Sequence, residues 1–176
     1  MPASPYAVSK ITQDFLALQY FLSYNIKIIR VRPFNHIGPR QAPYFVVSAF
    51  AKKIAEIEKG KTDNTLFVGN LDSKRDFTDV RDMVTAYSLA IEKGEAGEVY
   101  NIGSGKSYAI SQILDKMLSL SKTKIKVRVD ESLFRPSDNP DLVCNRSKFT
   151  NLTGWEPEIP IDKTLKDTLD YWRNII

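Results

Sequence analysis

The chain has 176 residues, of which 43% are hydrophobic and 26% charged, with a formal net charge of +4. This composition fits one globular domain with its own core. No apolar run approaches the roughly 20 residues that cross a bilayer, and no leader is recognisable, so a cytoplasmic location without membrane contact is expected. Lysines and arginines are dispersed among acidic residues, which argues against nucleic-acid binding, and the single cysteine, Cys144, excludes an internal disulfide framework.

Hydrophobic periodicity predicts alternating helices and strands. A helix is expected at about 6–23, where Ile11, Phe15, Leu18 and Leu22 recur at spacings of three and four. Further along the chain the pattern predicts strands at about 26–31, 65–69, 98–102 and 124–129, and helices at about 44–59, 79–93, 109–120, 146–152 and 162–174. Such alternation is typical of an α/β fold with mostly parallel strands.

The first helix carries Tyr6 and Lys10 in YAVSK, after Ser4 as a candidate N-cap and Pro5 at the first helical position. Residues four apart lie on one helical face. An ammonium roughly 5 Å from the phenol would favour phenolate by about 3 kcal/mol at an effective dielectric near 20. Such a pair suits proton transfer in an alcohol–ketone interconversion. The same spacing also fits a lysine stem packed against a ring.

The segment IGSGKSY at 102–108 looks like a phosphate loop but matches neither of two glycine patterns. A P-loop requires glycine where Tyr100 stands, and the dinucleotide fingerprint requires glycine where Tyr108 stands. We therefore expect a tight strand-to-helix turn here.

Several segments together resemble the extended short-chain dehydrogenase/reductase family and, within it, the nucleotide-sugar modifying enzymes. The segments are YAVSK, RVRPFNHIGPRQ (30–41), RDFTDVRDMVTAY (75–87), VYNIGSG (99–105), RPSDNPDL (135–142) and LTGWEP (152–157). NHIGPRQ and the following YFVVSAF are most similar to GDP-mannose 4,6-dehydratases and GDP-4-keto-6-deoxymannose reductases.

The resemblance implies the C-terminal half of an extended Rossmann-type enzyme, with a small mixed substrate-binding part. Residues 1–37 and 79–104 would belong to the dinucleotide-binding domain, and the remainder of 38–176 to the substrate-binding domain. Family members carry a Gly-rich turn ahead of the catalytic helix, and none precedes Tyr6. The chain taken alone is therefore expected to be incomplete and inactive.

The resemblance also implies roles for individual residues. Tyr6 would exchange a proton with the sugar 4-hydroxyl and Lys10 would hold the cofactor ribose. Cofactor contacts are expected from Tyr6, Lys10, Pro33, His36 and Arg40, the last of which could instead serve a partner subunit. Substrate contacts are expected from Asn35, Val46, Val47, Lys53, Arg75, Arg135 and Asp138. No metal is expected.

Some of these assignments have alternatives. His36 fits a structural hydrogen bond equally well, Asn35 a backbone cap, and Lys52 is as basic as Lys53. The resemblance also leaves the role of Asp138 open, because relatives often carry the longer Glu side chain near this position. Arg75 and Arg135 are expected in loops, where two planar guanidinium groups can hold a diphosphate.

The expected function is GDP-mannose 4,6-dehydration with NADP or NAD, through transient oxidation at C4. The alternatives are a GDP-4-keto-6-deoxy-sugar reductase, another nucleotide-sugar epimerase or dehydratase, and a non-catalytic nucleotide-sugar-binding or dimerisation module. The helices at about 6–23 and 44–59 are unusually apolar, with Phe15, Tyr20, Phe21, Phe45 and Phe50. We expect a homodimer or tetramer, unless these faces cover the sheet within one chain.

Overall fold

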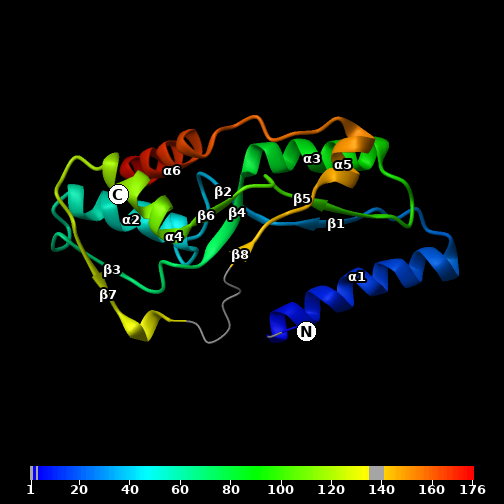
Figure 1. Ribbon diagram of the computed structural model, residues 1–176, viewed down its shortest axis with the longest axis horizontal. Coiled ribbons are helices and arrows are strands. Elements are labelled where there is room, and N and C mark those ends of the chain that lie inside the picture. The colour runs from blue at the N-terminus through cyan, green and yellow to red at the C-terminus, as the bar shows by residue number, and fades with distance from the viewer. Residues whose placement is uncertain (1, 3, 135–140) are drawn as a thin grey trace.

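The computed structural model describes residue 2 and residues 4–134 and 141–176. Helices and strands alternate along the chain, and the α/β prediction is confirmed (Figure 1). The helices are α1 (Pro5–Tyr24), α2 (Val46–Glu58), α3 (Val80–Lys93), α4 (Ile110–Ser119), the 3₁₀ helix η1 (Glu131–Leu133), α5 (Ser147–Thr153) and α6 (Ile161–Ile175). No helix in the described ranges has both the length and the apolar character needed to span a bilayer.

The strands are β1 (Arg30–Pro33), β2 (Asn35–Ile37), β3 (Thr65–Val68), β4 (Lys74–Asp79), β5 (Val99–Ile102), β6 (Ser107–Ala109), β7 (Lys126–Val129) and β8 (Asp141–Leu142). Parallel pairs join β1 to β5, β2 to β4, β3 to β7 and β4 to β8. Only β6 runs antiparallel to its neighbour, β4, among the described strands. The prediction of mostly parallel strands is therefore confirmed.

One strand prediction was wrong in placement, and the strands β2, β4, β6 and β8 were not predicted. The strand expected at 26–31 forms at Arg30–Pro33, and residues 75–79, expected in a loop, form most of β4. β4 escaped prediction because its sequence, KRDFTD, is mainly polar, yet Asp76, Thr78 and Asp79 are all buried. A buried strand with polar side chains shows no apolar alternation, and here the two carboxylates, Asp76 and Asp79, find hydrogen-bond partners inside the fold.

Two hydrophobic clusters hold these elements together. One brings α2, β3, β4, α4 and α6 around Ile54, Val68, Phe77, Ile113 and Leu165. The other packs α3 and α5 on β5 around Met83, Tyr100, Ile102, Phe149 and Trp155. None of the residues of α1 is buried, and this helix lies along one side of the molecule near β1 (Figure 1).

Segment 102–108 is a turn built around the buried carboxylate of Asp76. The amides of Ser104 and Gly105 each donate to Asp76 at 2.8 Å, and the Ser104 hydroxyl donates at 2.6 Å. The amide of Cys144 donates to the same carboxylate at 3.0 Å. The turn leads into β6 before α4, rather than directly into a helix as expected. The Ser104 and Gly105 amides already donate hydrogen bonds within the chain, as is typical of a structural turn.

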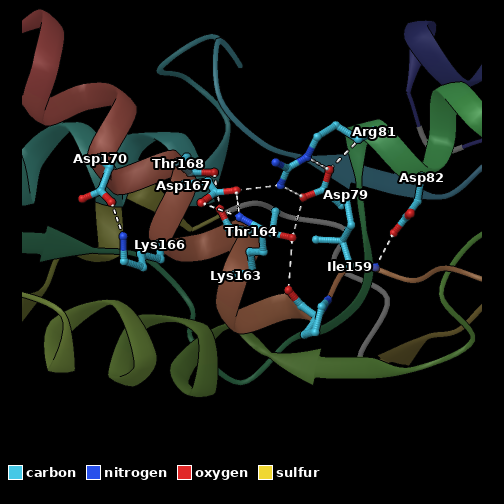
Figure 2. A network of polar contacts seen from close by, with 11 residues as sticks. Asp79, Arg81, Asp82, Ile159, Lys163, Thr164, Lys166, Asp167, Thr168 and Asp170 are labelled. Carbon is cyan, nitrogen blue, oxygen red and sulfur yellow. Dashed lines mark hydrogen bonds and ion pairs between the residues drawn. The ribbon is translucent and has the colours of Figure 1, made fainter.

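A second buried carboxylate, Asp79, joins the end of β4 to α6 (Figure 2). Asp79 caps α3 by accepting from the Arg81 amide at 2.8 Å and forms an ion pair with the Arg81 guanidinium at 2.7 Å. The Thr164 hydroxyl of α6 donates to Asp79 at 2.6 Å, and Arg81 also contacts Asp167 of α6 at 2.8 Å. The network fixes α3 and α6 relative to one another.

This network predicts acid sensitivity. Burial acts to raise the pKa of Asp79, but hydrogen bonds from Arg81 and Thr164 outweigh it and hold the pKa below its ordinary value. A carboxyl with a lowered folded-state pKa stabilises the fold above about pH 4, and this contribution is lost as the pH falls through the folded-state pKa.

We expect Asp79→Asn to lower the melting temperature near pH 7. The difference in melting temperature between this variant and wild type should narrow below about pH 3. Thermal unfolding followed by circular dichroism at several pH values measures this difference. Asp115→Asn, on the exposed face of α4, is the control and should melt like wild type throughout. A difference in melting temperature between Asp79→Asn and wild type that does not change with pH would contradict the prediction.

Candidate functional site

A groove of about 1210 Å³ runs between the start of α1 and the β3 region. It gathers nine of the residues that the sequence singled out: Tyr6, Pro33, Asn35, His36, Arg40, Val46, Val47, Lys53 and Arg75. Lys10 is not among the lining residues but contacts Tyr6. Arg135 and Asp138 lie outside the described residues.

Tyr6 and Lys10 meet at the start of α1. The Ser4 hydroxyl accepts from the Ala7 amide at 3.1 Å, so Ser4 is the N-cap and Pro5 the first helical residue, as predicted. The Lys10 ammonium lies 5.5 Å from the centroid of the Tyr6 ring and donates to Gln13 Oε1 at 3.2 Å. Tyr6 is 71% exposed, so its hydroxyl is open to a ligand in the groove.

Asp14, which sequence reasoning missed, attaches α1 to β1. Its Oδ1 accepts from Arg30 at 3.3 Å and its Oδ2 from Arg32 at 3.1 Å. Asp14 lies one helical turn beyond Lys10, so the same helical face carries the anchor and the tyrosine–lysine pair. The sequence signal for this contact was an acidic residue four positions after Lys10, followed by two arginines in the next strand.

The segment after β1 brings polar groups to the groove wall. Asn35 pairs with Phe77 in the β2–β4 ladder, so it lies in a strand and not at a turn. His36 Nδ1 is 3.2 Å from the Phe34 carbonyl oxygen, while the His36 carbonyl accepts from Gln41 at 2.9 Å. The histidine is thus held by a backbone contact while its ring lines the groove.

Arg40 adopts a positive φ of 71°, which is uncommon for a residue other than glycine. Such a conformation costs about 1–3 kcal/mol and is often kept where it positions a functional group. The Arg40 side chain lines the groove. Its backbone geometry therefore supports a binding role.

The first turn of α2 and strand β4 also line the groove. No side chain from the described residues caps α2, whose N-cap residue is Phe45. The amides of its first turn, which includes Val46 and Val47, are therefore available to an anionic group. Val47 is among the lining residues but is fully buried, so neither its side chain nor its backbone is exposed to solvent. Arg75 lies in β4, and not in the loop expected for it, and donates to the Lys74 carbonyl at 2.7 Å.

The cationic side chains of the groove favour an organic anion. These side chains are Arg40, Lys53 and Arg75. In the described ranges, no group of three or more histidine, cysteine, aspartate or glutamate side chains is placed to hold a metal. A groove of this size and charge suits a phosphorylated small molecule.

The mostly parallel α/β fold, with Tyr6 lining the groove and Lys10 beside it, is that of Rossmann-type short-chain dehydrogenase/reductase structures. The family model described as GDP-mannose 4,6 dehydratase matches residues 1–168. The chain therefore belongs to the GDP-mannose 4,6 dehydratase family, and the resemblance found in its sequence is confirmed.

Relatives include both dehydratases and a reductase. The chain is 35% identical over 173 residues to GDP-6-deoxy-D-mannose reductase of Pseudomonas aeruginosa, covering 98% of this chain and 57% of that protein. It is 28% identical over 171 residues to GDP-mannose 4,6 dehydratase 1 of Arabidopsis thaliana, covering 96% of this chain and 47% of that protein. The chain thus spans about half the length of the curated relatives it matches.

Solved structures agree with this placement. The structure of RMD from Pseudomonas aeruginosa complexed with NADPH superposes with a TM-score of 0.94 at 34% identity, covering 100% of this chain and 58% of that one. A UDP-glucose 4-epimerase from Thermotoga maritima, solved with UDP-glucose, superposes with a TM-score of 0.84 at 27% identity, covering 99% and 55%.

Proposed function

We propose that the complete protein containing this chain is an NAD(P)-dependent enzyme acting at C4 of a GDP-linked sugar. The single observation that carries this proposal is the groove, which has Tyr6 at its entrance and cationic side chains along its walls. The family membership of the chain supports the same class of reaction.

The residues present fit a nicotinamide dinucleotide at the Tyr6 end. When bound, the dinucleotide supplies or accepts the hydride. Tyr6 would take the proton of the sugar 4-hydroxyl during oxidation and return it during reduction. Lys10 would hold the ribose beside the phenol ring, Pro33 and His36 would line the nicotinamide side, and Arg40 would pair with a cofactor phosphate.

The substrate diphosphate would lie between Arg75, Asn35 and the first turn of α2. Arg75 would provide charge-assisted hydrogen bonds, and the helix N-terminus would add backbone donors of its first turn, which begins at Val46. We keep Arg135 and Asp138 as proposed substrate contacts on the strength of the sequence resemblance. These groups would hold the sugar C4 near Tyr6, so that proton and hydride transfer take place at one end of the groove.

The division into two domains is also a proposal. We infer that residues 1–37 and 79–104 belong to a dinucleotide-binding part and the remainder to a substrate-binding part. The separate clusters around Met83 and Ile54 support a division between α3–β5 and α2–α6. Limited proteolysis with and without NADPH would test it, and protection independent of NADPH would count against it.

Dehydration and reduction remain two candidate activities. The family description favours dehydration of GDP-mannose, while the identity to the Pseudomonas aeruginosa reductase favours reduction of a 4-keto-6-deoxy sugar. Incubation of the complete protein with GDP-mannose tests the first by product analysis. Incubation with GDP-4-keto-6-deoxymannose and NADPH tests the second by the loss of NADPH absorbance. Inactivity in both assays would refute the proposed enzyme.

The base preference is expected to be guanine over uracil and thymine. We predict that GDP binds more tightly than UDP or dTDP, because the segments NHIGPRQ and YFVVSAF are most similar to those of enzymes that act on GDP-linked sugars. Competition among the three nucleotides, measured by calorimetry, gives the order of affinity. Equal binding of all three would contradict the prediction.

We also propose a homodimer or a higher oligomer. Val8, Phe15, Leu16, Tyr20 and Leu22 are exposed apolar residues on α1, and Tyr44 and Phe45 are exposed ahead of α2. An apolar surface of this kind is stabilised when a partner covers it. Light scattering on the complete protein over a range of concentrations measures its mass, and a monomer at every concentration would rule the proposal out.

A further inference from the structure

Helix α1, which carries Tyr6 near its start, touches the rest of the described chain mainly through its second half. None of its residues is buried. The partly buried ones are Ala7, Asp14, Ala17, Leu18 and Phe21. Four of these five follow Gln13, so the end of the helix that enters the groove is held in place through the half that comes after it (Figure 1).

The polar attachment of this half is the carboxylate of Asp14. Its Oδ1 forms an ion pair with Arg30 Nη1 at 3.3 Å, and its Oδ2 accepts from Arg32 Nε at 3.1 Å and also from Arg32 Nη2. The Asp14 and Arg30 side chains are only 16% and 11% exposed, so water screens their attraction less than at an open surface. Among the described residues, no other side chain of α1 forms a hydrogen bond to another helix or strand.

Arg30 connects this ion pair to the apolar attachment of α1. Its Nη2 donates to the Gly97 carbonyl at 3.1 Å. The ring of Phe21 packs directly on Gly97, where an added Cβ would lie 2.2 Å from Phe21 Cε1. Arg30 Nε is buried without a partner among the described residues. A guanidinium held at this depth depends on its carboxylate, and removal of Asp14 would leave the cation unpaired.

Strand β1, to which Asp14 attaches the helix, leads directly into the groove wall. Pro33 is the last residue of β1 and lines the groove, as does His36 in the following strand. The strand is fixed in turn by its parallel pairing with β5, in which Arg32 is the register partner of Asn101. Asp14 therefore connects the helix that carries the tyrosine to a rigid part of the binding site.

The distance between the attachment and the tyrosine makes this contact sensitive. Asp14 follows Tyr6 by eight positions, which is about 12 Å along the helix at about 1.5 Å per residue. A tilt of about 5° at Asp14 would move the start of the helix by about 1 Å, and a displacement of about 1 Å can lower a catalysed rate about a hundredfold.

We propose that Asp14 is a positioning residue for Tyr6. By holding α1 on Arg30 and Arg32, it fixes the place of the Tyr6 hydroxyl relative to the wall of the groove. Asp14 is not among the residues that line the groove, so it acts on the reaction through the tyrosine. This inference rests on the proposed function, in which the Tyr6 hydroxyl transfers the proton.

The first test compares kcat and KM of Asp14→Asn and wild type in the complete protein, in whichever of the two assays given above shows turnover. We expect kcat to fall at least about tenfold and KM to stay within about threefold, because the residues that line the groove are unchanged. Asp14→Glu keeps the carboxylate and should lose less activity than Asp14→Asn. An unchanged kcat in Asp14→Asn would overturn the proposal.

The matched control is Asp162→Asn at the start of α6. It makes the same chemical change and also breaks an ion pair, which Asp162 forms with Lys116 at 2.7 Å. Both side chains are well exposed, and neither lines the groove. The control should keep the wild-type kcat and KM.

A second test determines whether Asp14 acts through Tyr6. When Asp14→Asn is added to Tyr6→Phe, we expect kcat to fall by less than about twofold further, because the hydroxyl that Asp14 positions is already absent. A further loss as large as that in the wild-type background would reveal damage independent of Tyr6 and would overturn the proposal.

Hydrogen exchange followed by mass spectrometry tests the same role without turnover. Amides at positions 7–13 should exchange at least about tenfold faster in Asp14→Asn than in wild type, while those of α6 exchange at the wild-type rate. Equal exchange in α1 would refute the proposal. If wild type shows no turnover in either assay, the proposed function fails, and the exchange rates still decide whether Asp14 holds the Tyr6 end of the helix.

Discussion

Tyr6→Phe is expected to lower turnover of the complete enzyme by at least about a hundredfold while leaving nucleotide-sugar affinity nearly unchanged. Phenylalanine keeps the ring against which the Lys10 side chain lies, and removes only the hydroxyl. The proton that must leave or reach the sugar oxygen then has no positioned partner. Because this group acts in the transition state, the loss appears in kcat rather than in binding.

Steady-state rates and a calorimetric titration on the same variant test this expectation. The matched control is Tyr24→Phe, which removes the same hydroxyl from an exposed tyrosine at the far end of α1. It should retain wild-type turnover. Near-normal turnover in Tyr6→Phe would remove Tyr6 from the proton-transfer step.

The largest expected effect on stability is at Asp76, whose side chain is fully buried. Its carboxylate accepts from two donors of Ser104 and from the amides of Gly105 and Cys144. Asn in its place keeps one acceptor oxygen and turns an NH₂ group toward backbone N–H donors. We expect Asp76→Asn to lower the free energy of unfolding by about 3 kcal/mol, since donors left unpaired in the interior each cost about 1–3 kcal/mol.

For a domain of this size, that loss corresponds to a fall in melting temperature of roughly 6–12 °C. Thermal and urea unfolding of Asp76→Asn beside wild type measure it. Asp115→Asn makes the same chemical change at an exposed position and should stay within about 0.5 kcal/mol of wild type. An Asp76→Asn variant as stable as this control would mean that the turn at 102–108 does not depend on the carboxylate.

The helices were predictable because their apolar positions recur with the helical period, and burial on one face produces that period. α2 and α6 form within two residues of their predicted bounds. The family was also recognisable, since its motifs occur in order along the chain and motif order is a property of the sequence. The N-cap of α1 followed from local chemistry alone, because Ser4 bonds a backbone amide only three residues away.

Contacts between distant residues were decided by the tertiary structure. Asp76 meets Cys144, 68 positions later, and Asp79 meets Thr164, 85 positions later. Neither pair leaves a periodic or local signal, so β4 was expected to be a loop. The same holds for Phe67 and Arg128, which lie side by side only because β3 pairs with β7. The sequence alone determined the family and the helical framework, because both depend on local pattern. The polar contacts of Asp76 and Asp79 and the set of side chains that line the groove depend on chain topology, which only the tertiary structure decides.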